Sequence, residues 1–129
     1  METNYQEASN LKFELKSDGV LLVRPHGPLG REDFDALASA VDPWITTHGK
    51  LQGVVFSVSK FPGWKNLASF IHHMEFINSH HRKVRRIGLA ADGVLPELIS
   101  KLAAHFVEAE IKQFPFAETD KAEAWASGK

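Results

Sequence analysis

The chain of 129 residues contains no cysteine. This absence excludes disulfide bonds, thiolate metal sites and cysteine nucleophiles, and it agrees with a cytoplasmic location, where disulfides are rare. Basic charge is not in excess either, because 15 lysines and arginines stand against 16 acidic residues and the formal net charge is -1. Proteins that bind nucleic acid usually carry a strong basic excess, so we predict no nucleic-acid partner.

Long hydrophobic runs are missing as well. No apolar stretch approaches the roughly 20 residues that a membrane-spanning helix needs. The N-terminus is polar and acidic, unlike a signal peptide. With 43% hydrophobic and 24% charged residues, the composition is that of a folded globular protein. We therefore expect one domain over residues 11–129, preceded by a flexible tail of residues 1–10.

Hydrophobic periodicity predicts strands that alternate with amphipathic helices. The predicted strands cover residues 11–15, 20–23, 51–58, 86–91 and 109–114. The predicted helices cover residues 31–47, 64–80, 95–106 and 119–126. Ser17, Asp18 and Gly19 form the predicted hairpin turn between the first two strands. This order indicates a single-domain α/β fold with a mixed, mostly parallel five-stranded sheet and about four helices.

Five segments punctuate this pattern, namely residues 19–29, 41–51, 61–64, 80–88 and 109–115. Together they resemble the SpoIIAA-like family of small bacterial proteins, which is related to STAS domains. The resemblance implies a STAS-type fold and a binding or regulatory role. The family fold is also similar to that of CRAL-TRIO lipid carriers, which enclose an apolar ligand between helices and sheet.

In STAS antagonists, a phosphorylatable serine begins the helix after the third strand, and the strand ends in Asp-x-Ser. Here the strand end reads Ser57-Val-Ser59 and the helix start reads Trp64-Lys-Asn66. The aspartate and the helix-start hydroxyl are both missing. The resemblance therefore does not extend to a phosphoserine switch.

The candidate binding site is the rim that follows the predicted strand 51–58. Ligands of open α/β sheets bind at the carboxyl ends of strands, and here that end continues into an aromatic loop. The next helix is apolar over about half its circumference, more than a surface helix needs. This face is either buried in the core or a dimer interface, or it lines an apolar pocket or docks on a partner or membrane. The candidate ligand- or partner-binding residues are Ser57, Ser59, Phe61, Trp64, Phe70, Met74, Ile77 and Asp92.

Two polar features leave alternatives open. Asp92 ends the predicted strand 86–91, where its carboxylate either orients a ligand or caps the next helix and turn. Basic residues that follow a predicted helix either complement its dipole or bind anionic lipid headgroups. These headgroup candidates are Arg82, Lys83, Arg85 and Arg86. The histidine pairs 72–73 and 80–81 lack metal-site spacing, so we predict no metal and no cofactor.

Motifs of catalysis are absent from the sequence. It contains no phosphate-binding loop, no nucleophile elbow and no complete dinucleotide fingerprint. We therefore predict a non-enzymatic STAS-type binding or regulatory module that acts through the apolar rim and the helix after the third strand. The alternative is a carrier or sensor of an apolar, lipid-like ligand with peripheral membrane contact. A protein partner, an apolar small molecule or a second copy of the chain would be the corresponding partner.

Overall fold

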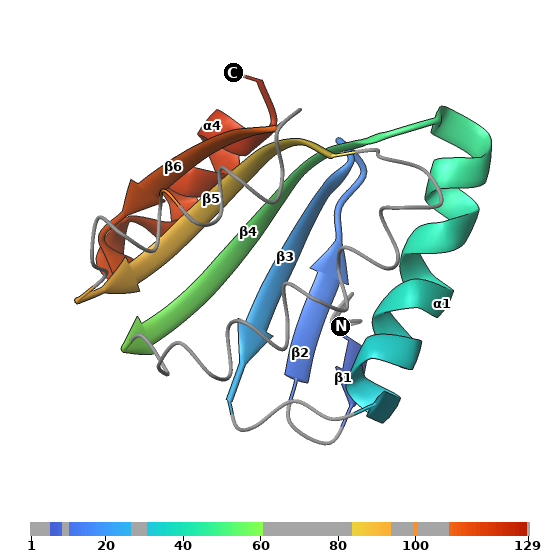
Figure 1. Cartoon of the computed structure of the whole chain (residues 1–129), viewed down its shortest axis with the longest axis horizontal. Helices are drawn as coiled ribbons and strands as arrows, with labels where there is room; N and C mark the ends of the chain where they lie inside the picture. Colours follow the sequence, from blue (N-terminus) through green and yellow to red (C-terminus); the bar gives the residue numbers. More distant parts are fainter. Residues whose placement is uncertain are drawn as a thin grey trace.

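The computed structural model describes residues 6–8, 11–26, 31–60, 84–93, 100 and 109–128. In this part of the chain, a curved six-stranded sheet carries a helix on each of its faces (Figure 1). One face is covered by α1 (Arg31–His48). The other is covered by α4 (Thr119–Ala126), which directly follows a short 3-10 helix, η1 (Phe116–Glu118). The described part of the chain therefore has three layers, with the sheet in the middle.

The strands lie in the sheet in the order in which they occur in the chain. They are β1 (Gln6–Ala8), β2 (Leu11–Leu15), β3 (Val20–Pro25), β4 (Leu51–Lys60), β5 (Val84–Asp92) and β6 (Glu110–Phe114). The pairs from β1 to β3 are antiparallel, and those from β3 to β6 are parallel. Because the order never reverses, the described sheet lacks the topological switch point at which ligands of open α/β sheets usually bind. Binding therefore depends on the side chains that the strand ends carry.

The predicted hairpin turn between β2 and β3 is present. Gly19 has a φ of +85°, a left-handed conformation that favours glycine. Its amide donates a hydrogen bond of 3.0 Å to the Lys16 carbonyl. The Asp18 carboxylate accepts a bond of 3.2 Å from the Val20 amide. The glycine therefore provides the positive φ that the turn requires, and the aspartate side chain adds a hydrogen bond within the turn.

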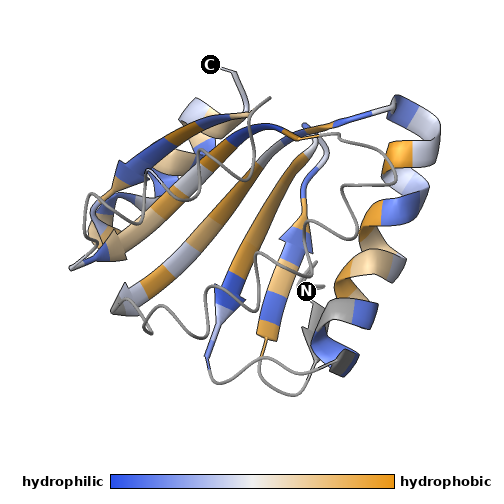
Figure 2. Cartoon of the chain, in the orientation of Figure 1, coloured by the Kyte–Doolittle hydropathy of each residue, from blue (hydrophilic) through white to orange (hydrophobic). Residues whose placement is uncertain are grey.

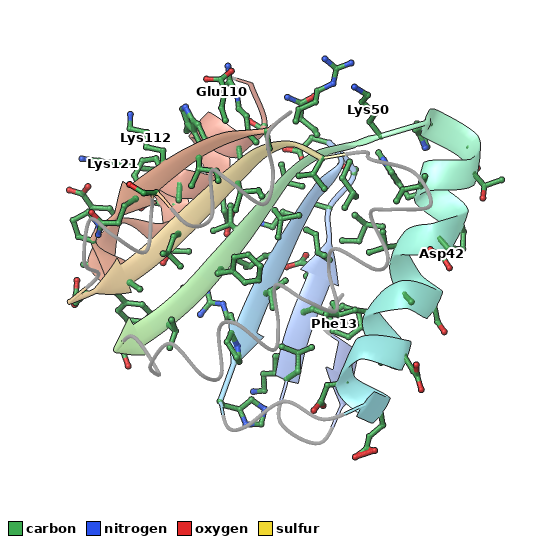
Figure 3. The ribbon with its side chains drawn as sticks, viewed as in Figure 1. Phe13, Asp42, Lys50, Glu110, Lys112 and Lys121 are labelled. Atoms are coloured by element: carbon green, nitrogen blue, oxygen red, sulfur yellow. The ribbon has the colours of Figure 1, made fainter. Side chains whose placement is uncertain are left out.

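The face of the sheet that carries α1 is packed with large apolar side chains. Leu37, Val41 and Ile45 recur every four residues along α1, so they form one stripe against the strands. Figure 2 shows this hydrophobic side of α1 turned to the sheet and a more hydrophilic outer side. Phe13 of β2, only 1% exposed, fills the space between the sheet and α1 (Figure 3). Burial of such side chains stabilises the layer by roughly 1.5–3 kcal/mol for each large residue.

The face that carries α4 is packed much more closely. Ala122 and Ala126 are fully buried and lie one helical turn apart against the strands. A Cβ added at Gly53 of β4 would lie only 2.7 Å from the Ala126 Cβ and its carbonyl oxygen. At Gly88 of β5, an added Cβ would lie 3.5 Å from the Ala122 Cβ. The absence of a side chain at Gly53 therefore lets the end of α4 rest on the backbone of β4.

The structure confirms the mixed α/β sheet and all five predicted strands, and it corrects one detail. A sixth strand, β1, lies within residues 1–10, which we expected to be a flexible tail, and pairs with β2. Three residues are too short a run for alternation to be read from sequence. Of the about four predicted helices, the described residues hold two, α1 and α4. The predicted helices 64–80 and 95–106 fall almost wholly in the segments 61–83, 94–99 and 101–108, which lie outside the described residues.

Gly53→Ala should lower the free energy of unfolding by about 1–3 kcal/mol, the usual cost of overpacking a tight core. The added methyl group would meet backbone atoms of Ala126 at a distance that no side-chain rotation relieves. Gly88→Ala is the matched control, because its added Cβ would make only ordinary van der Waals contacts. Urea denaturation of both variants measures the difference. Equal losses of stability would contradict the close approach of α4 to β4.

Candidate functional site

The carboxyl ends of β4 and β5 form the edge at which the sequence predicts binding. β4 continues two residues beyond the predicted end, to Lys60. A β-bulge lies between Val58, which pairs with Ala91, and Lys60, which pairs with Asp92. Ser59 is the extra residue of the bulge and is exposed. Because bulges bend a strand and redirect its side chains, β4 bends directly before the predicted aromatic loop.

Ser57 is buried beneath the start of α4, with 3% of its surface exposed. Its hydroxyl lies 2.8 Å from the Thr119 hydroxyl, and the latter donates a bond of 2.7 Å to the Phe116 carbonyl. A carbonyl oxygen only accepts, so the single Thr119 proton is used there and Ser57 is the donor to Thr119. This chain of hydrogen bonds joins β4 to η1 and α4. The role of Ser57 in binding stays a prediction, since its hydroxyl here serves an internal contact.

Asp92 is exposed at the end of β5 and caps the 3-10 helix. Its carboxylate accepts a hydrogen bond of 3.1 Å from the Phe116 amide, the first amide of η1. Sequence reasoning left open a capping role and a ligand-orienting role. The observed contact is a capping contact. The residue that it caps belongs to η1, whereas the sequence predicted capping of the next helix along the chain. The second carboxylate oxygen has no hydrogen bond to another described residue.

Arg24 is a basic residue of the same edge that sequence reasoning did not find. Val23 of β3 pairs with Phe56 of β4, so the next residues, Arg24 and Ser57, lie side by side. Both are on the face of the sheet that carries α4. Across β2 and β3 it pairs with Lys12, a like charge, which is an unfavourable neighbour. The Nε atom of Arg24 is buried and has no hydrogen-bond partner in the described part of the chain. Its position in the strand was the available signal, because the two alternate residues before it are buried.

The two described residues of the predicted basic cluster lie on different faces of the sheet. Arg85 and Arg86 are consecutive in β5, so their side chains point to opposite faces. The Arg86 guanidinium donates a bond of 2.7 Å to the Trp125 carbonyl at the end of α4 and lies 5.2 Å from the centre of that indole ring. It also lies 3.7 Å from the Glu110 carboxylate. Arg86 therefore secures α4, whereas Arg85 is exposed.

Seven of the predicted site residues lie outside the described residues. They are Phe61, Trp64, Phe70, Met74, Ile77, Arg82 and Lys83. The aromatic rim and its helix therefore stay predictions. Of the remaining five candidates, Ser57, Ser59 and Asp92 lie at the carboxyl edge, and Arg85 and Arg86 lie near the start of β5, at the opposite end.

A pocket that sequence reasoning missed lies at the opposite end of the parallel strands, where β4 and β5 begin. It is open to solvent and has a volume of 390 Å³. Its lining residues are Asp18, Trp44, His48, Gly49, Lys50, Gln52 and Arg85. They come from the β2–β3 turn, the end of α1 and the starts of two strands. No local motif joins these segments, so only the sheet register brings them together.

Within the described ranges, no three histidine, cysteine or acidic side chains gather to hold a metal ion. Among the described helices, none is long and apolar enough to cross a membrane.

Comparison with protein families gives one match. The model of the SpoIIAA-like family matches residues 20–127, which include every described strand from β3 onward and both described α-helices. Comparisons with curated proteins and with solved structures find no match.

Thr119→Val should destabilise the protein by about 1–3 kcal/mol, because it leaves the buried Ser57 hydroxyl without its partner. In the double variant S57A/T119V no hydroxyl remains unpaired, so its loss should be smaller than the sum of the two single losses. Chemical denaturation of the three variants completes the cycle. Strictly additive losses would show that the two hydroxyls do not interact.

Proposed function

Because the chain belongs to the SpoIIAA-like family, we propose that it is a non-enzymatic binding module that recognises a protein partner at the carboxyl edge of its sheet. Phe61 and Trp64 would provide the buried contact area, and Phe70, Met74 and Ile77 would extend it along the helix that the sequence predicts over residues 64–80. Aromatic residues are the commonest anchors of protein interfaces, which makes this loop the best candidate.

The observation that carries the proposal is how the polar groups of this edge are used. The Ser57 hydroxyl donates to Thr119, whose proton is donated to a carbonyl. A catalytic serine instead needs a base within hydrogen-bond reach that removes its proton. The Asp92 carboxylate accepts from the Phe116 amide. These groups therefore support the shape of the edge, as expected for a surface that binds.

Arg24 supports the choice of a polar macromolecular partner. Its buried Nε–H has no acceptor among the described residues, and an unpaired buried donor costs about 1–3 kcal/mol. The Nε atom itself is shielded, so a carbonyl or carboxylate oxygen of a partner would meet the other guanidinium N–H groups of this half-buried residue. The exposed Ser59, on the bulge at the same edge, offers a further hydroxyl group.

The second hypothesis from the sequence, a carrier of an apolar ligand that touches a membrane surface, depends on the same aromatic residues. It differs in what they would contact, because a carrier would enclose a lipid-like molecule and a binding module would present the aromatic groups to a partner. A homodimer is the special case in which the partner is a second copy.

We expect a photo-crosslinking amino acid at position 61 or 64 to capture a protein in cells that make this protein naturally. The same group at Asp42, exposed on α1, is the control. Trp64→Ala should weaken capture at position 61, because loss of an interface anchor costs about 2 kcal/mol or more, which is roughly thirtyfold in Kd. Gel shifts and mass spectrometry identify the adducts. Identical adducts at positions 42, 61 and 64 would contradict the proposed surface.

A further inference from the structure

The pocket where β4 and β5 begin has a rigid aromatic wall. Trp44 donates a hydrogen bond of 3.1 Å from its indole Nε1 to the Lys50 carbonyl. The His48 ring stacks on the indole, with centroids 3.8 Å apart and planes 14° from parallel. The indole also packs on Gly19, where an added Cβ would lie 3.0 Å from a ring carbon. This wall is therefore held in place by the protein itself, a preorganisation that lowers the cost of binding.

Lys50 and Arg85 bring two cations to this pocket from different parts of the chain. Lys50 lies where the chain passes from α1 to β4 (Figure 3), and Arg85 is the second residue of β5. Within the described residues, neither side chain forms an ion pair or a hydrogen bond. Asp18 is the one acidic lining residue, and it accepts a bond from the Val20 amide. The cations therefore outnumber the carboxylates at the pocket.

Stabilisation of the α1 C-terminus is the ordinary explanation for cations at this place. Neither side chain, however, donates to a carbonyl of this turn, and three carbonyls near this end of the helix are bonded to other donors. The His48 Nδ1 lies 3.2 Å from the Trp44 carbonyl and must be the donor to it. The Gly49 amide donates to the Ile45 carbonyl at 2.7 Å, and the Thr47 hydroxyl donates to the Pro43 carbonyl at 2.9 Å. Lys50 and Arg85 are therefore free to bind something else.

We propose that this pocket binds a phosphomonoester group, held between Lys50 and Arg85. The guanidinium fork of an arginine matches two oxygens of a phosphate, and a lysine adds a point charge. The Gln52 amide at the pocket wall is a further, neutral donor. The volume of 390 Å³ exceeds the need of an inorganic ion and lies in the range of about 300–1,000 Å³ that is typical of ligand pockets. The phosphate belongs to a larger molecule, either a soluble metabolite or a lipid headgroup.

This site is independent of the proposed partner surface. It lies at the opposite end of the parallel strands and uses only Arg85 of the basic run that the sequence singled out. Failure of the protein to capture a partner at the carboxyl edge would not affect the phosphate proposal. Failure to bind phosphate would not affect the proposed partner surface.

The test uses the full chain and two double variants with equal loss of charge. K50Q/R85Q removes the two pocket cations. K112Q/K121Q removes two exposed cations on the β6–α4 side, away from the pocket, and is the control (Figure 3). Inorganic phosphate is titrated while amide and indole NMR signals are recorded. In parallel, the proteins are sedimented with phosphatidylcholine vesicles with and without phosphatidic acid.

We expect phosphate to shift the signals of the Trp44 indole and of the lining residues in the wild-type and control proteins. K50Q/R85Q should bind at least about tenfold more weakly, which corresponds to the loss of about one charge-assisted hydrogen bond. K50R, which keeps the charge, should retain binding. If K50Q/R85Q loses binding to phosphatidic acid vesicles and the control variant keeps it, the ligand is a lipid headgroup. If phosphate shifts the pocket signals but the wild-type protein does not bind the vesicles, the ligand is a soluble molecule. No shift at the pocket, with equal vesicle binding by both double variants, would overturn the proposal.

Discussion

The structure depends on one contact between a helix and a strand. Glycine and alanine form this contact, so the two backbones lie close together. Gly53 of β4 leaves room for Ala126 of α4 to lie on the strand backbone, and Ala122 lies similarly over Gly88. This contact determines how far α4 stands from the sheet. At one end of the helix, Thr119 is therefore close enough to bond to Ser57, and at the other the Trp125 carbonyl reaches Arg86. A larger residue at Gly53 would separate these pairs.

The same arrangement explains why the two ends of the sheet differ chemically. At the carboxyl edge, hydroxyl and carboxylate groups are used to hold η1 and α4, and the buried Arg24 Nε is the donor left unsatisfied among the described residues. At the amino edge, the side chains of Lys50 and Arg85 form no hydrogen bond or ion pair within the described residues, so their charges stay available. These differences underlie the two proposals, a partner surface at the carboxyl edge and a phosphomonoester site at the amino edge.

The strand and helix pattern could be predicted because it depends on local periodicity, and the β2–β3 turn because it depends on Asp18 and Gly19. Contacts between distant segments could not. Ser57 was selected as a rim residue, yet whether it faces solvent or α4 is decided by a partner 62 positions away. Arg85 and Arg86 were treated as one cluster, although strand alternation separates them. The stack of Trp44 on His48 joins residues four apart in one helix, but its place beside Arg85 depends on the sheet register.

We propose that this member of the SpoIIAA-like family binds a partner at the carboxyl edge of its sheet and does not enclose an apolar ligand. Native mass spectrometry of the full chain, purified gently and without detergent, tests that distinction most directly. We expect a protein mass, as monomer or dimer, without a bound apolar molecule. Extra mass that is released on denaturation and identified as a lipid-like molecule would contradict the proposal and favour the carrier.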